Sequence, residues 1–157
     1  MRWGEFRVAR PDLAEAGRAL LYQFGVGLAF LGTIRRDGGP RVHPVCPIIF
    51  HDGLFAFIIP SPKRDDLARD SRYALHAFPP ADNEDAFYLT GRAVRATDET
   101  LRSAVAAAFL AERGWSDDPP DFDQQWLFEF LVESCLLTRT TGHGDFAPEQ
   151  SAWRAGS

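Results

Sequence analysis

The chain has 157 residues, 45% of them hydrophobic and 13% aromatic, which is enough for one folded domain and excludes a disordered chain. Its net charge of −5 argues against a nucleic-acid partner, because such proteins usually present a basic face. No apolar run approaches the ~18 residues of a membrane span, and the N-terminus lacks the apolar block of a signal peptide, so we expect a cytoplasmic protein with no membrane partner.

The first part of the chain predicts a helix followed by three strands. Apolar residues at helical spacing indicate the helix, and Asp-Gly or Gly-Gly pairs between apolar runs indicate tight turns. Tight turns imply antiparallel pairing of the strands they join. The predicted elements are a helix over 12–24, strands over 27–36, 41–50 and 54–59, and turns at 37–39 and 51–53.

The second part mixes strands and helices. Asp98 is expected to cap a helix, and Asp121 with Gln124 resembles a capping box that opens another. The predicted elements are helices over 62–69, 99–113 and 121–131, strands over 73–78, 86–97 and 135–141, and an irregular tail from 142.

These elements predict a mainly β (α+β) fold: a six-stranded antiparallel split β-barrel with flanking helices. We expect a single domain over 1–157, with its core over about 12–141 and an irregular tail over 142–157.

The predicted strand over 41–50 contains candidate binding residues. Alternation places Arg41 and His43 on one face, ~7 Å apart. Pro44 and Pro47 remove backbone donors, which indicates an edge strand or a break and leaves peptide groups for a ligand. The alternative is a barrel edge with an exposed Arg-His pair. Zinc takes three or four ligands, so His43 near Cys46 does not predict a metal site, and we expect both cysteines of the chain to be reduced.

The helix predicted over 62–69 begins with an unusual charge pattern. Ser61 is a favourable N-cap and Pro62 suits the first helical position. Lys63 and Arg64 then place positive charge at the positive end of the helix dipole, which is unfavourable unless an anion binds there. The alternative is that Asp65 and its neighbour Asp66 neutralise the turn while the cations point to water. No P-loop, dinucleotide-binding or nucleophile-elbow motif is present.

Four pieces of sequence resemble the pyridoxamine 5′-phosphate oxidase-like family of FMN-binding split barrels, over roughly residues 12–113. They are LGTIRRDGGPRVHPV (residues 31–45), the apolar strand after the second turn, Ser61-Pro62-Lys63 followed by Leu67, and FYLTGRAVRATD (residues 87–98). The resemblance implies a homodimer that binds two FMN molecules at the subunit interface.

The resemblance also implies which residues bind the cofactor. Arg41, Ser61 and Lys63 match positions that hold the flavin phosphate, with Arg64 beside them. The backbone of Val42, His43, Pro44 and Val45 would run along the flavin ring, with His43 also available to the phosphate or the ribityl chain. Ile58 and Ile59 would lie against the ring, and Trp153-Arg154 matches a C-terminal pair that reaches the active site.

The resulting hypothesis is an FMN-dependent oxidoreductase that acts on an unidentified small molecule. No catalytic side chain is predicted, because the flavin itself transfers hydride or electrons. The alternative is a protein that binds or stores a flavin, a deazaflavin or haem without turnover.

Overall fold

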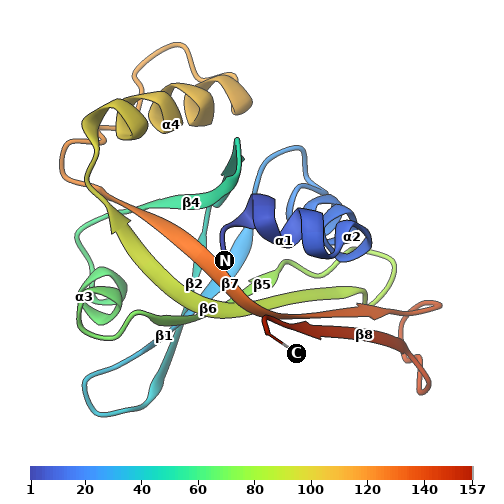
Figure 1. Cartoon of the computed structure of the whole chain (residues 1–157). Helices are drawn as coiled ribbons and strands as arrows, with labels where there is room; N and C mark the ends of the chain where they lie inside the picture. The colour runs from blue at the N-terminus through green and yellow to red at the C-terminus, as the bar shows by residue number, and fades with distance from the viewer. Residues whose placement is uncertain (157) are drawn as a thin grey trace.

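The computed structural model describes residues 1–156, and Ser157 lies outside the described residues. Within them, helices flank one antiparallel sheet of eight strands (Figure 1). The elements are α1 (Trp3–Ala9), α2 (Pro11–Leu21), β1 (Ala29–Ile34), β2 (Pro40–Val45), β3 (Ile48–Phe50), β4 (Gly53–Ile58), α3 (Pro62–Arg69), β5 (Arg72–Ala77), β6 (Ala86–Ala96), α4 (Glu99–Glu112), β7 (Trp126–Arg139) and β8 (Glu149–Arg154).

The predicted mainly-β fold with flanking helices is confirmed, with eight strands in place of six. The strand order is β2-β1-β5-β6-β7-β4-β3, and β8 pairs with β7. The two edge strands of this path, β2 and β3, are separated in the chain only by Cys46 and Pro47. The sheet is therefore open between two edges that are neighbours in sequence, as expected for a split barrel.

The single strand predicted over 41–50 is two strands. β2 ends at Val45, and β3 begins at Ile48 and pairs with β4 instead of β1. Pro47 has no N–H to continue a ladder, so the chain leaves one edge at this point and joins the other. The expectation that the two prolines mark an edge or a break is confirmed: Pro44 lies on the edge strand β2, and Pro47 lies in the break between β2 and β3.

The prediction of a helix over 121–131 is wrong, because the long strand β7 begins at Trp126. Phe128, Phe130 and Val132 alternate along β7 and are buried in the core, which is a period-two pattern. Asp121 organises a loop instead of a helix: its carboxylate accepts from the backbone N–H of Asp123, and its carbonyl oxygen accepts from the Gln125 side chain.

Two elements were absent from the sequence prediction. α1 has only seven residues, too few to show a helical period, yet it buries Trp3 and Phe6. The tail predicted to be irregular contains β8, whose residues are mostly exposed and so show no alternation. The Trp153 ring lies 5.1 Å from the Phe6 ring, which ties the tail to α1.

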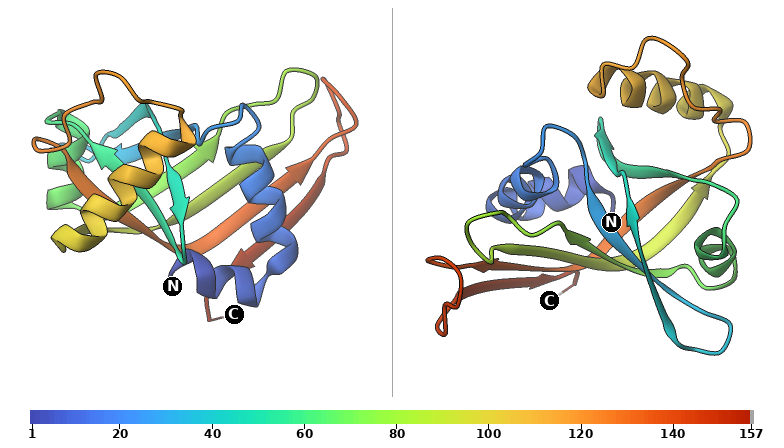
Figure 2. Two further views of the ribbon diagram at one scale, coloured as in Figure 1. Left: turned by 90° about the horizontal axis from the view of Figure 1, so that it is seen from above. Right: turned by 180° about the vertical axis from the view of Figure 1, so that it is seen from behind.

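The helices lie on different parts of the sheet (Figures 1 and 2). α1 and α2 cover the main core, whereas α4 packs against β3 at one end of the sheet. A second apolar cluster holds α4 in place; its buried members are Ile48, Phe55, Val105, Phe109 and Leu127. Within residues 1–156 no helix has both the length and the apolar character needed to cross a membrane.

The N-cap of α4 has a measurable role in stability. The Asp98 carboxylate accepts a 2.7 Å hydrogen bond from the backbone N–H of Leu101, as the sequence predicts. We expect Asp98→Ala to lower the free energy of unfolding by about 1 kcal/mol in chemical denaturation. Thr100→Ala, an exposed change in the same helical turn, is the control. An equal loss in both variants would contradict the capping role.

Candidate cofactor-binding site

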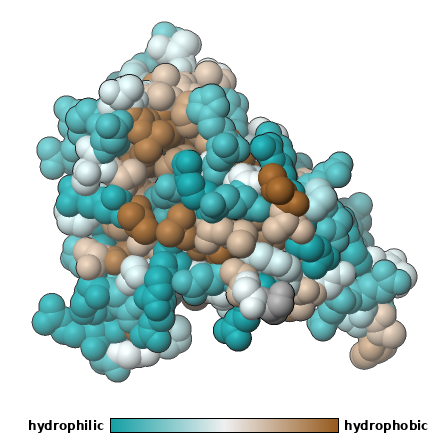
Figure 3. Space-filling model, in the orientation of Figure 1, coloured by the Kyte–Doolittle hydropathy of each residue, from teal (hydrophilic) through white to brown (hydrophobic). Residues whose placement is uncertain are grey.

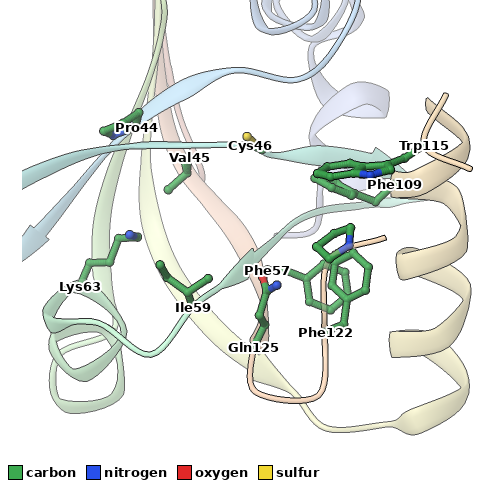
Figure 4. A pocket seen from close by; sticks show the side chains of 11 residues that line it. Pro44, Val45, Cys46, Phe57, Ile59, Lys63, Phe109, Trp115, Phe122 and Gln125 are labelled. Carbon is green, nitrogen blue, oxygen red and sulfur yellow. The ribbon is translucent and has the colours of Figure 1, made fainter. Parts of the chain in front are cut away.

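A cavity of about 250 Å³ lies between the end of β2, the end of β4, the start of α3 and α4 with the loop that follows it (Figure 4). Lys63 lies at one end of this cavity, and a group of aromatic rings lies at the other. The cavity is lined by Pro44, Val45, Cys46, Phe57, Ile59, Lys63, Phe109, Trp115, Pro120, Phe122 and Gln125.

Lys63 is a half-buried cation without a counterion. Among residues 1–156 its ammonium group makes no ion pair or hydrogen bond, and partial burial lowers the pKa of Lys63. Ser61 occupies the N-cap position of α3, but its hydroxyl donates to the Ile59 carbonyl (2.8 Å) and does not cap the helix. An unpaired ammonium therefore adjoins a helix N-terminus that lacks a side-chain cap, which favours an anion.

Arg41 is held against α3 by a buried carboxylate. The register of β1 and β2 places Thr33 opposite Arg41, and both side chains donate to Asp66, at 2.9 and 2.7 Å. Asp66 is 3% exposed and also accepts from Arg69. Burial acts to raise the pKa of Asp66, but the hydrogen bonds from Arg41, Thr33 and Arg69 outweigh it and lower the pKa.

This arrangement removes Asp66 from the second interpretation of the helix start, and Asp65 is exposed and makes no ion pair within residues 1–156. Asp66 points into the protein and pairs with arginines of β2 and α3, so it does not neutralise Lys63. Residues three apart on a helix share a face, which places Lys63 and the Asp66–Arg41 pair along one side of α3. Only the Nε of Arg41 bonds to Asp66. Its terminal nitrogens have no partner within residues 1–156 and are available to an anion.

Arg64 lies away from Lys63. Its guanidinium stacks on the Trp126 ring at 4.5 Å and donates to the Gln124 carbonyl oxygen. Arg95 stacks on the same ring at 3.6 Å. The two cations that are adjacent in sequence therefore point in different directions, and only Lys63 lines the cavity.

The other predicted site residues fall into three groups. Pro44, Val45 and Ile59 line the cavity with Lys63, whereas Val42 and His43 lie further back on β2 and do not line it. Ile58 points into the main core.

Trp153 and Arg154 lie on β8, beside β7 and α1, and line a different pocket. Within one chain the structure does not bring them to Lys63.

The aromatic end of the cavity was not predicted. It is formed by Phe57, Phe109, Trp115 and Phe122. The only sequence signal was the excess of aromatic residues, 13 Phe and 4 Trp, over what a small barrel needs in its interior. Cys46, which was considered only as a metal ligand, also lines the cavity. It is not disulfide-bonded.

Comparison with solved structures identifies the fold. A haem-binding protein from Mycobacterium smegmatis superposes with a TM-score of 0.69 at 19% identity, over 92% of this chain and 59% of that one. A candidate pyridoxamine 5′-phosphate oxidase from Listeria innocua superposes with a TM-score of 0.65 at 15% identity, over 80% of this chain and 98% of that one. A NimC/NimA family protein from Clostridium acetobutylicum superposes with a TM-score of 0.60 at 15% identity, over 87% of this chain and 91% of that one.

The chain therefore has the split-barrel fold of the pyridoxamine 5′-phosphate oxidase-like proteins, and the resemblance predicted from the sequence is confirmed at the level of fold. It spans only 59% of the length of the M. smegmatis protein. No family model matches the sequence, and no curated protein matches it either.

Proposed function

We propose that this chain binds FMN in the cavity beside α3 and acts as a flavin-dependent oxidoreductase on a small molecule. The observation that carries the proposal is Lys63, an uncompensated ammonium group at an uncapped helix N-terminus in a cavity. A phosphate there would gain charge-assisted hydrogen bonds of about 1.5–3 kcal/mol each. The terminal nitrogens of Arg41 would be further donors, and the Ser61 hydroxyl would become one on releasing the Ile59 carbonyl oxygen.

The rest of the cavity suits the flavin ring. Among the described strands β2 pairs only with β1, so the outward peptide groups of this edge strand would be free for polar atoms of the ring. The apolar side chains of Val45 and Ile59 would pack against it. The bound flavin would supply the hydride or electron transfer. The protein's own part is to hold the phosphate at Lys63, orient the ring along β2 and exclude water with the apolar wall.

A carrier of flavin, deazaflavin or haem without turnover is the second candidate, favoured by the fold shared with the M. smegmatis haem-binding protein. For haem the cavity is less suited, since no histidine is among the described residues that line it. The Cys46 thiol is the one sulfur ligand that it offers.

A homodimer is part of this proposal. Val42 is 63% exposed, and Ile59, which lines the cavity, is 52% exposed. Apolar surface also gathers between α4 and the strands below it (Figure 3). Exposed apolar surface of this kind is typical of an interface. Light scattering on the purified chain should give twice the monomer mass.

The function is tested by titrating the purified chain with FMN. We expect binding with a shift in the flavin absorbance spectrum and a rise in the melting temperature, because a ligand that binds the folded state stabilises it. Rapid mixing of the complex with NADH or NADPH under anaerobic conditions then follows bleaching of the flavin band.

A chain that binds none of FMN, deazaflavin and haem would contradict both candidates. Tight binding of FMN without reduction by either nicotinamide, and without turnover, would favour the carrier.

A further inference from the structure

One end of the cavity is a wall of packed aromatic rings. Phe57 comes from β4 and Phe109 from α4, whereas Phe122 comes from the loop between α4 and β7. The Phe57 and Phe122 ring centroids are 4.4 Å apart, and those of Phe109 and Phe122 are 5.9 Å apart in an edge-to-face arrangement. These three rings form a continuous apolar surface at the end away from Lys63 (Figure 4).

Trp115 lines the same end but is not part of that wall. Its side chain is 44% exposed and makes no aromatic contact or hydrogen bond within residues 1–156. Aromatic rings prefer offset-stacked or edge-to-face partners, which add to the gain from burial. An unpartnered indole beside a packed aromatic wall therefore provides a second surface for a planar guest.

The charges around this end disfavour a cationic guest. Among the described residues that line the cavity there is no Asp or Glu, and Lys63 is the one cation. Arg113 lies over the Phe109 ring at 4.5 Å and Arg102 over the Phe57 ring at 5.8 Å, and neither arginine lines the cavity. Two of the wall rings thus already interact with cations. A further cation would find no carboxylate among the described residues that line the cavity.

We propose that the aromatic end is the substrate subsite and that it takes a planar, uncharged aromatic molecule. Identifying the guest as a substrate rests on the flavin function proposed above, whereas binding of the ring does not. The cavity of about 250 Å³ is smaller than the roughly 300–1,000 Å³ of pockets for drug-sized ligands, so a guest beside a bound flavin is limited to a single ring.

Benzamide is a suitable probe, because two close analogues separate shape from charge. Cyclohexanecarboxamide keeps the amide but replaces the flat ring, and benzamidine keeps the ring but is a cation. In titrations of the full chain followed by NMR, we expect benzamide to bind roughly five-fold more tightly than either analogue. Equal affinity for all three compounds would overturn the proposal.

Variants locate the site of binding. We expect Trp115→Ala to weaken benzamide binding roughly five-fold, with little change in melting temperature because Trp115 is 44% exposed and contacts no other aromatic ring within residues 1–156. Phe146→Ala is the matched control, since Phe146 is fully exposed and does not line the cavity. An effect of the same size in both variants would overturn the proposal.

Repeating the titration with bound FMN separates this inference from the proposed function. Benzamide that binds equally well with and without FMN supports a substrate subsite next to the cofactor. Displacement of benzamide by FMN would overturn it, because the aromatic end would then hold the flavin ring. Trp115-dependent binding of benzamide by a chain that does not bind FMN would support the aromatic subsite and contradict the flavin function.

Discussion

Replacing Asp66 by alanine should lower the free energy of unfolding by about 3 kcal/mol, the largest effect we expect from a single polar substitution. The carboxylate is 3% exposed and accepts from Arg41, Thr33 and Arg69. Its removal leaves partly buried guanidinium groups without a counterion. Chemical denaturation of the two proteins measures the difference.

The control for this substitution is the adjacent residue. Asp65→Ala removes an exposed carboxylate from the same helical turn, so we expect a loss below roughly 1 kcal/mol. The loss of unfolding free energy in Asp66→Asn should lie between those of Asp65→Ala and Asp66→Ala, because asparagine keeps an acceptor for Thr33 but removes the charge. Equal losses for Asp65→Ala and Asp66→Ala would contradict the buried network.

The contribution of Asp66 to the free energy of unfolding should depend on pH. Because its folded pKa is lowered below the unfolded value of about 4, the folded state binds fewer protons than the unfolded state in this range. The stabilisation is therefore fully present above the unfolded pKa and is lost as pH falls through the folded pKa. We expect the stability difference between wild type and Asp66→Asn to shrink below pH 4 and to be constant between pH 6 and 8.

Replacing Lys63 by alanine should weaken FMN binding by about 1.5–3 kcal/mol, or roughly 10- to 150-fold. Lys63 has no ion-pair or hydrogen-bond partner for its ammonium group within residues 1–156, so its loss costs little stability while it removes the cation proposed to bind the phosphate. Fluorescence titration with FMN measures the affinity. Riboflavin, which lacks the phosphate, should bind wild type and Lys63→Ala equally.

Arg64→Ala is the matched control, because Arg64 follows Lys63 in the chain but stacks on Trp126. We expect it to leave the FMN affinity within about two-fold of wild type, since it removes no phosphate contact. An unchanged affinity in Lys63→Ala, or an equal loss in Arg64→Ala, would remove Lys63 from the proposed phosphate site.

The sequence alone predicted most of the sheet and the position of α3. Hairpin turns have strong local signals: Gly38 adopts a φ of +84°, which its missing side chain permits, and the turn joins β1 to β2 as predicted. The start of α3 at Pro62 and the Asp98 cap are equally local. Periodicity and turn chemistry act over a few residues, so the elements that depend on them were predictable.

Other features depended on contacts between distant parts of the chain. β7 pairs with β4, β6 and β8, and this pairing prevails over a capping box near Asp121. α1 and β8 are too short or too exposed to show a pattern, and they are stabilised by packing of Phe6 against Trp153.

For the candidate site, the sequence identified Lys63 as a cation at a helix start, and the family resemblance added Arg41 on strand β2, but neither could show where the charges of these two residues were compensated. That depended on the register that places Thr33 and Arg41 together against Asp66, and on the stacking of Arg64 on Trp126. The aromatic end of the cavity, including Trp115, was likewise decided by the packing of α4 against β3 in the second apolar cluster. Charge pattern along a chain shows which groups need a partner, whereas only the tertiary structure decides which of them find one.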